Sequence, residues 1–166
     1  MTTPRPSVAD LYTRVIAPIW LDAAQLTDYA ASLRGLPPLT EETTRQTLRT
    51  LWDVRKPLSK RRKGIKHMAK TATWDVYRLH DIAWNVARAA AYEPGEKLLP
   101  LAPYAEKFVL RNAAHCARAA AWHLAWQLAR EDPDHADGDT IWNQLQPPRI
   151  HAAAALAAAK LTGNPA

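Results

Sequence analysis

The sequence is short of several residue types, and each shortage excludes a class of protein. Among its 166 residues there are one cysteine, Cys116, one phenylalanine and five glycines. A single cysteine excludes an intramolecular disulfide framework and a cysteine-based zinc cluster, and it favours a reducing, cytoplasmic setting. No apolar run reaches the roughly 18 residues that a membrane span needs, so we expect no membrane segment.

Cofactor motifs are also lacking. The sequence contains neither the Gly-x-Gly-x-x-Gly loop nor the Gly-x-x-x-x-Gly-Lys loop that cradles nucleotide phosphates. Its first residues lack the basic-then-apolar run of a secretory signal. The acidic stretch 131–139 has a spacing close to that of a calcium loop, but it is one residue off the EF-hand pattern and has no glutamate at the bidentate position. We therefore expect no cofactor and no bound metal.

What is present favours helices. Ala, Leu, Arg and Gln, all good helix formers, dominate the chain, and alternating strand-like runs are nearly missing. We predict an all-α protein with a single compact domain of about six or seven helices over residues 1–161 and a flexible tail at 162–166. The stretch at about 103–130 is apolar or Ala on almost every face, which predicts a central, buried, Ala- and Trp-rich helix.

Prolines mark the expected helix boundaries. Ser7 is expected to cap a first helix that Pro18 ends or kinks, and Pro57 is expected to end the third helix. Loops are predicted for the basic segment 55–70, the Pro-rich segment 93–103 and the acidic stretch 131–139.

Seven tryptophans are spread over nearly all of the expected helices. We interpret them as core side chains that fill the gaps between Ala-rich helices. Stacking platforms for nucleic-acid bases are the functional alternative.

The positive charge is concentrated in one place. The chain has 22 Lys and Arg against 16 Asp and Glu, and eight of the basic residues fall in the basic segment 55–70, which reads RKPLSKRRKGIKHMAK and contains no acidic residue. Without this segment 14 basic residues remain against 16 acidic ones, so the net charge of +6 comes entirely from it. Such a cluster is expected to bind phosphates, because Lys and Arg release the counterions of a nucleic-acid backbone and Arg can bond phosphate oxygens in pairs.

We therefore predict a non-enzymatic, nucleic-acid-associated protein that holds the backbone of DNA or RNA with little base specificity. A helical small subunit or an accessory protein of a larger nucleoprotein complex fits this prediction equally well. The candidate binding residues are Arg55, Lys56, Lys60, Arg61, Arg62, Lys63, Lys66, His67 and Lys70. Three alternatives stay open for the basic segment: a regulatory or inhibitory contact with an acidic protein partner, docking on the acidic stretch 131–139, and a solvated loop without a specific role.

Polar residues on the long apolar helix form a second candidate site. Burying such groups costs several kcal/mol unless they find partners. Arg111, His115 and Arg118 follow one another at one-turn spacing, so they share a face that can line a pocket or a groove. The simpler interpretation is a set of interior polar residues bonded to neighbouring helices. His80, on another apolar stripe, is likewise expected to be a hydrogen-bonded core histidine.

Arg118 and His123 have an Arg-x4-His spacing that is similar to the motif of HEPN-type ribonucleases. The resemblance covers these two residues and implies a small all-α enzyme that cuts RNA without a metal, usually at a dimer interface, with the histidine and arginine acting on the 2′-hydroxyl and the scissile phosphate. The residue types suit this chemistry, because histidine titrates near neutrality and arginine binds phosphate. Arg62 and His67 have the same spacing but fall in the predicted basic loop.

Overall fold

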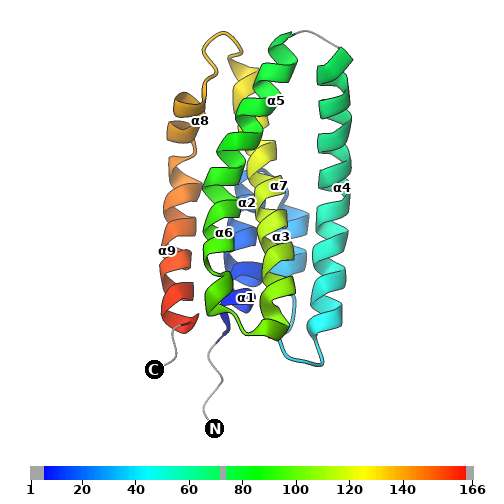
Figure 1. Cartoon of the computed structure of the whole chain (residues 1–166), viewed down its shortest axis with the longest axis vertical. Coiled ribbons are helices and arrows are strands. Elements are labelled where there is room, and N and C mark those ends of the chain that lie inside the picture. The colour runs from blue at the N-terminus through cyan, green and yellow to red at the C-terminus, as the bar shows by residue number, and fades with distance from the viewer. Residues whose placement is uncertain (1–5, 72–73, 164–166) are drawn as a thin grey trace.

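The computed structural model describes residues 6–71 and 74–163, in which the helices form seven continuous runs (Figure 1). In chain order the elements, including the π-helical turns η1 and η2, are α1 (Val8–Leu11), η1 (Tyr12–Ile16) and α2 (Ala17–Ala23); α3 (Thr27–Arg34); α4 (Thr44–Thr71); α5 (Trp74–Ala87), η2 (Arg88–Tyr92) and α6 (Glu93–Lys97); α7 (Lys107–Glu131); α8 (Gly138–Gln144); and α9 (Gln146–Gly163). Two short 3-10 turns connect α6 to α7; they are η3 (Leu99–Leu101) and η4 (Tyr104–Glu106). These residues contain no strand, which confirms the all-α prediction. In the same residues no helix is both long and apolar enough to cross a membrane.

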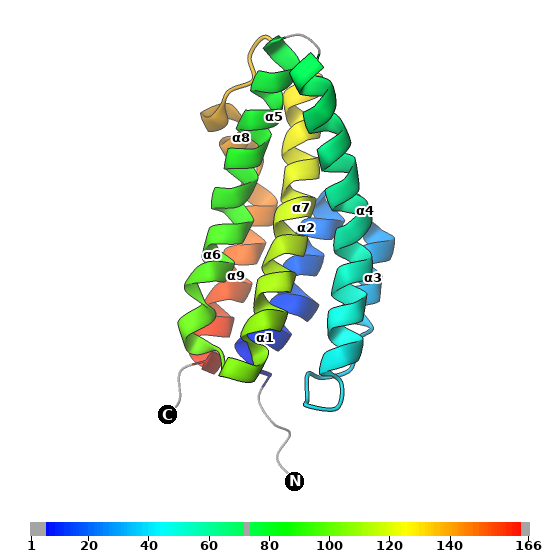
Figure 2. The ribbon, with the colours of Figure 1, turned by 45° about the vertical axis from the view of Figure 1, so that its right-hand side comes forward.

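Helix α7 is the central helix of the bundle. Helices α2, α4 and α5 pack along it (Figure 2). Half of its buried residues are alanines, and Trp122 and Trp126 are also buried. Alanine lets neighbouring helices approach closely, and the two indoles fill the wider gaps. The central buried helix predicted at about 103–130 is therefore confirmed, although Phe108 near its start is 63% exposed.

The first helical run continues past Pro18 instead of ending there. Ser7 caps this run as predicted, since its Oγ accepts a hydrogen bond from the N–H of Asp10 at 3.1 Å. The π-helical turn η1 directly precedes Pro18, which lies in the first turn of α2. The expected break is replaced by a wider turn within one continuous helix.

The basic segment 55–70 is helical, which corrects the prediction of a loop. It forms the second half of α4, and Pro57 lies inside that helix rather than at its end. Val54 and Leu58 on either side of the proline are almost fully buried, whereas Pro57 itself is exposed. Apolar contacts on both sides therefore hold the helix together against a local cost of about 3 kcal/mol for the proline.

The Pro-rich segment 93–103 is also largely helical rather than a loop. Pro94 lies in the first turn of α6, a position that proline favours. Gly95 is buried where α6 meets α7: a Cβ built on it would lie 2.7 Å from the Cβ of Ala114 and 3.0 Å from the Oη of Tyr12. Glycine at this position permits a close helix contact, whereas the sequence suggested a turn.

Two glycine substitutions should have opposite effects on stability. Gly95→Ala should lower the free energy of unfolding by about 1–3 kcal/mol, because the added methyl group overlaps Ala114. Gly64→Ala should raise it by about 0.5–1 kcal/mol, because Gly64 lies inside α4 with open space around it. Urea unfolding of both variants measures the difference, and equal shifts would contradict the close packing of α6 on α7.

Residues 132–137 of the acidic stretch form the turn between α7 and α8, whereas Glu131 ends α7 and Asp139 lies in the first turn of α8. Asp137 caps α8, with its Oδ1 accepting a hydrogen bond from the N–H of Thr140 at 2.7 Å.

Helix α5 anchors this turn through Arg78. The guanidinium donates hydrogen bonds to the carbonyl oxygens of Pro133 at 2.7 Å and Ala136 at 2.9 Å. None of the salt bridges between residues that the structure describes joins the acidic stretch to the basic segment.

Candidate functional site

Helix α4 distributes the predicted binding residues over neighbouring faces. Arg55 and Arg62 line a hollow that α4 forms with α5 and α7. An exposed row at helical spacing, which we call the lysine stripe, consists of Lys56, Lys60, Lys63 and His67. Arg61 and Lys66 are also exposed, and the side chain of Lys70 lies outside the described part of the chain.

The indole of Trp84 on α5 contacts two guanidinium groups. The Cζ of Arg62 lies 4.1 Å from the ring centroid, and the Cζ of Arg118 lies 4.3 Å from it. Arg118 also lies over the ring of Tyr92, with its Cζ 4.6 Å from that centroid. Because guanidinium groups stack favourably on aromatic faces, these contacts fix both arginines at the junction of α4, α5 and α7.

His115 lies among Arg55, Arg62 and Arg118, which we call the arginine cluster. Its Nδ1 is 3.1 Å from the Nη2 of Arg118, and its ring centroid is 4.9 Å from that of Tyr92. Burial, followed by the charges of Arg55, Arg118 and Arg62, lowers the pKa of His115 to about 4. The imidazole is therefore neutral at pH 7 and can accept a hydrogen bond from Arg118.

The cluster has no carboxylate partner among the described residues. The salt bridges of these residues lie elsewhere, and none includes Arg55, Arg62 or Arg118. Burial, followed by the charge of Arg62, lowers the pKa of Arg118 to about 10, and burial and Arg55 lower the pKa of Arg62. Arg55 donates a hydrogen bond, at 3.4 Å, to the amide oxygen of Asn112. The site thus carries a concentrated positive charge that nearby described side chains do not neutralise.

A wider hollow adjoins the first one. The two share Arg55 and His115 and have volumes of about 30 Å³ and 310 Å³. The first has room for little more than a water molecule, so the wider hollow is the part that can admit a ligand. We call the two together the arginine groove; its polar and aromatic lining consists of Trp52, Arg55, Ser59, Arg62, Trp84, Phe108, Arg111, Asn112, His115, Arg118 and Trp122. Arg111, His115 and Arg118, the shared face of α7 noted in the sequence, all line it.

Two exposed aromatic side chains border the wider hollow. Trp52 is 53% exposed and Phe108 is 63% exposed, and both lie beside Arg111 in its lining. Neither was a predicted site residue, because we interpreted the tryptophans as core side chains, with base stacking as the alternative, and placed Phe108 on a buried helix. A signal was available for Trp52: on a continuous helix it lies one turn before Arg55 and so shares its face.

Arg118 and His123, the pair that is similar to the HEPN motif, lie in different surroundings. Arg118 is part of the arginine groove, whereas His123 is 6% exposed and packs against Trp122 with 5.2 Å between ring centroids. The Nε2 of His123 is buried and has no hydrogen-bond partner among the residues that the structure describes. The other pair of this spacing lies on helix α4 and not in a loop, with Arg62 in the groove and His67 on the lysine stripe. The ribonuclease hypothesis stays a prediction from the spacing.

Among the residues described, no group of three or more His, Cys, Asp or Glu side chains is close enough to hold a metal ion. The fold and the groove define the chain as an all-α protein with an arginine-rich, aromatic-bordered groove beside its central helix. Comparisons with protein-family models, with curated proteins and with solved structures find no match for the chain.

Proposed function

We propose that the protein binds single-stranded nucleic acid along the arginine groove and does not cut it. The observation that carries the proposal is the cluster of Arg55, Arg62 and Arg118 around His115, without a carboxylate partner among the described residues. Holding like charges together in a partly buried place costs free energy. A phosphate group in the groove would offset that cost and would receive the paired hydrogen bonds that guanidinium groups offer.

The exposed aromatic side chains that border the groove favour a single strand over a duplex as its ligand. Bases of an unpaired strand stack on exposed aromatic side chains whatever their identity, and Trp52 and Phe108 are exposed beside the arginines. The lysine stripe lies on α4, as Arg55 and Arg62 do, and it extends the positive surface beyond the groove. Backbone contacts and stacking together give binding with little base specificity, which suits a small subunit or an accessory protein of a larger nucleoprotein complex.

Fluorescence anisotropy with labelled single-stranded DNA and RNA tests the proposal. The whole chain should bind with an affinity that falls steeply with salt, because phosphate contacts release counterions. Arg62→Gln and Trp52→Ala should each lower the affinity about five- to tenfold, the first by removing a phosphate contact and the second by removing a stacked base. Arg62→Gln should also reduce the slope of log affinity against log salt by about 1.

Lys160→Ala is the matched control. Lys160 is exposed on α9, which does not line the groove, and its removal changes the net charge as Arg62→Gln does. This variant should bind like the wild type. The proposal fails if neither DNA nor RNA binds at about 50 mM salt, or if the two charge-removing variants weaken binding equally.

The same preparation discriminates the two alternatives. Labelled RNA should stay intact; cleavage that His123→Ala abolishes would support the ribonuclease hypothesis instead. An acidic protein partner would be indicated if nucleic acid fails to bind while a protein partner is captured and then lost on charge reversal at Lys60 and Lys63.

A further inference from the structure

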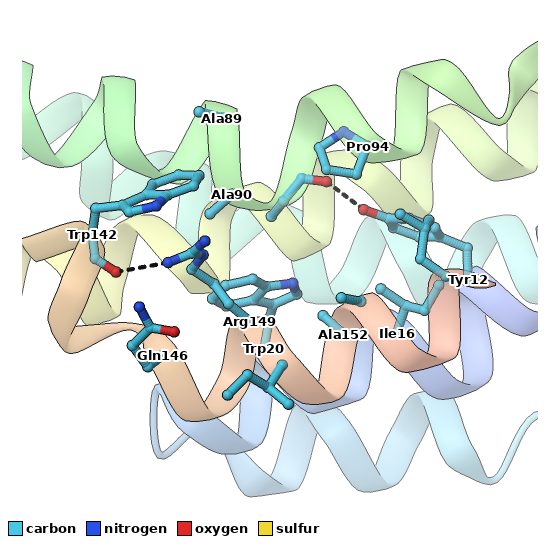
Figure 3. A pocket seen from close by; sticks show the side chains of 14 residues that line it. Tyr12, Ile16, Trp20, Ala89, Ala90, Pro94, Trp142, Gln146, Arg149 and Ala152 are labelled. Carbon is cyan, nitrogen blue, oxygen red and sulfur yellow. Dashed lines mark hydrogen bonds between the residues drawn. The ribbon is translucent and has the colours of Figure 1, made fainter. Parts of the chain in front are cut away.

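A second cavity lies apart from the arginine groove and shares no lining residue with it. Its volume of about 350 Å³ is within the range of small-molecule sites. Its walls come from η1 and α2, from η2 and α6, and from α8 and α9. Figure 3 shows Arg149, Trp142 and Tyr12 lining the space between α9 and the segment that carries Ala90 and Pro94. We call this space the apolar cavity.

Two π-helical turns form walls of the apolar cavity. Tyr12 and Ile16 belong to η1, and Ala90 and Ala91 belong to η2. The hydroxyl of Tyr12 donates a hydrogen bond to the carbonyl oxygen of Ala91 and so joins the two turns (Figure 3). Such turns are frequent at functional sites. The small alanine side chains of η2 and α9 leave the volume between the walls open.

Arg149 and Trp20 are among the hydrogen-bond donors in this mostly apolar lining. The guanidinium of Arg149 lies over the ring of Trp142, 3.9 Å from its centroid, and donates to the carbonyl oxygen of that residue at 3.1 Å. None of the salt bridges between described residues includes Arg149, so its charge has no carboxylate partner there. Trp20 is fully buried, and its indole N–H has no acceptor among the described residues. Because Trp20 is fully buried, Arg149 is the donor that a ligand oxygen can reach, and such a partner would offset the desolvation cost of its charge.

We propose that the apolar cavity binds a small carboxylic acid with a hydrocarbon body. The carboxylate would pair with Arg149, and the hydrocarbon part would lie against Ile16, Ala90 and Leu156, which line the same space. A single cation among apolar walls favours one anionic group and disfavours a polyanion, whose remaining charges would be desolvated without partners. The apolar cavity therefore selects a different ligand from that of the arginine groove.

Isothermal titration calorimetry of the full chain with octanoate and with octanol tests the charge requirement. Octanoate should bind saturably at one site, and octanol, which has the same chain length, should bind at least about tenfold more weakly. Arg149→Gln should lower the affinity for octanoate about tenfold and leave that for octanol unchanged, because it removes the charge and keeps most of the side chain's length.

A steric pair of variants tests the location without altering the charge. Ala153 and Ala154 are both exposed on α9, but only Ala153 lines the apolar cavity. Ala153→Leu should abolish octanoate binding by filling the cavity, whereas Ala154→Leu should bind like the wild type. Absence of saturable octanoate binding, equal affinities for octanoate and octanol, or unchanged binding by Ala153→Leu would each overturn the proposal. Binding of nucleic acid should be the same in all three variants, so the two sites can fail independently.

Discussion

Trp122→Ala is expected to lower the free energy of unfolding by about 3–5 kcal/mol. Trp122 is fully buried on α7, and its ring packs against those of His80, His123 and Trp126 with centroids 5.6, 5.2 and 6.0 Å away. Truncation to alanine leaves a cavity bordered by these three rings, which α5 and α7 hold in place. The rings can fill little of the space, so the cost should lie near the upper end of the usual range for large-to-small substitutions.

Trp52→Ala provides the matched control for this prediction. The same side chain is removed, but Trp52 is 53% exposed at the border of the arginine groove. Its loss should cost no more than about 1 kcal/mol, because little packing disappears. Urea denaturation of both variants gives the comparison, and similar losses would show that Trp122 does not occupy the core.

Acid should destabilise the fold between about pH 6.5 and pH 4. Burial lowers the pKa of both His115 and His123 to about 4, in each case with help from nearby arginines; it also lowers the pKa of His80. As the pH falls below 6.5 the unfolded chain binds protons at these positions and the folded chain does not, so unfolding becomes more favourable. His115 and His123 should each cost roughly 3 kcal/mol of stability by the lower end of this window.

Two groups oppose this trend. The carboxylate of Asp132 raises the pKa of His135, and burial raises the pKa of Asp10 despite its salt bridge to Arg14. Both therefore bind protons more readily in the folded state and favour it as the pH falls. His135 is fully exposed, so its interaction is screened by solvent and the net slope follows the buried histidines.

Thermal or urea unfolding across this pH range measures the effect. His115→Gln and His123→Gln should each flatten the acid limb of the stability curve, because glutamine does not titrate. A wild-type stability that is constant from pH 7 to pH 4 would contradict the burial of these imidazoles.

Most helices can be predicted from the sequence, whereas the segments in which the structure differs from the prediction are determined by tertiary packing. The central helix α7 is readable because its apolar residues cover every face. Pro57 and Gly95 led to wrong loop predictions, because both residue types have a low intrinsic propensity for helix interiors. Buried neighbours such as Val54 and Leu58 hold α4 intact, and close contact with Ala114 requires the glycine of α6. Such contacts join distant parts of the chain, so no local pattern reveals them.

The candidate site was only half visible in the sequence for the same reason. The charge count located Arg55 and Arg62, and the helical spacing on α7 placed His115 and Arg118 on one face. Nothing in the sequence joins these two sets, which meet because α4 packs beside α7. Because residues 55–70 were predicted to form a loop, the helical spacing that separates Arg55 and Arg62 from the lysine stripe was not predicted.

The alanine run of η2 lies within one long helix that lines two different surfaces. Trp84, which lines the arginine groove, precedes η2. Tyr92, which contacts Arg118, is the last residue of η2, and Pro94, which lines the apolar cavity, follows it. A π-turn holds one residue more than the α-turn it replaces, and the helix absorbs the insertion without a break. Deleting one alanine from residues 89–91 would convert this π-turn into an ordinary α-turn, so Tyr92 and Pro94 should keep their faces while the wall of the apolar cavity loses one of its alanines. The extra residue therefore shapes the wall of the apolar cavity and leaves the residues after it in phase with the groove.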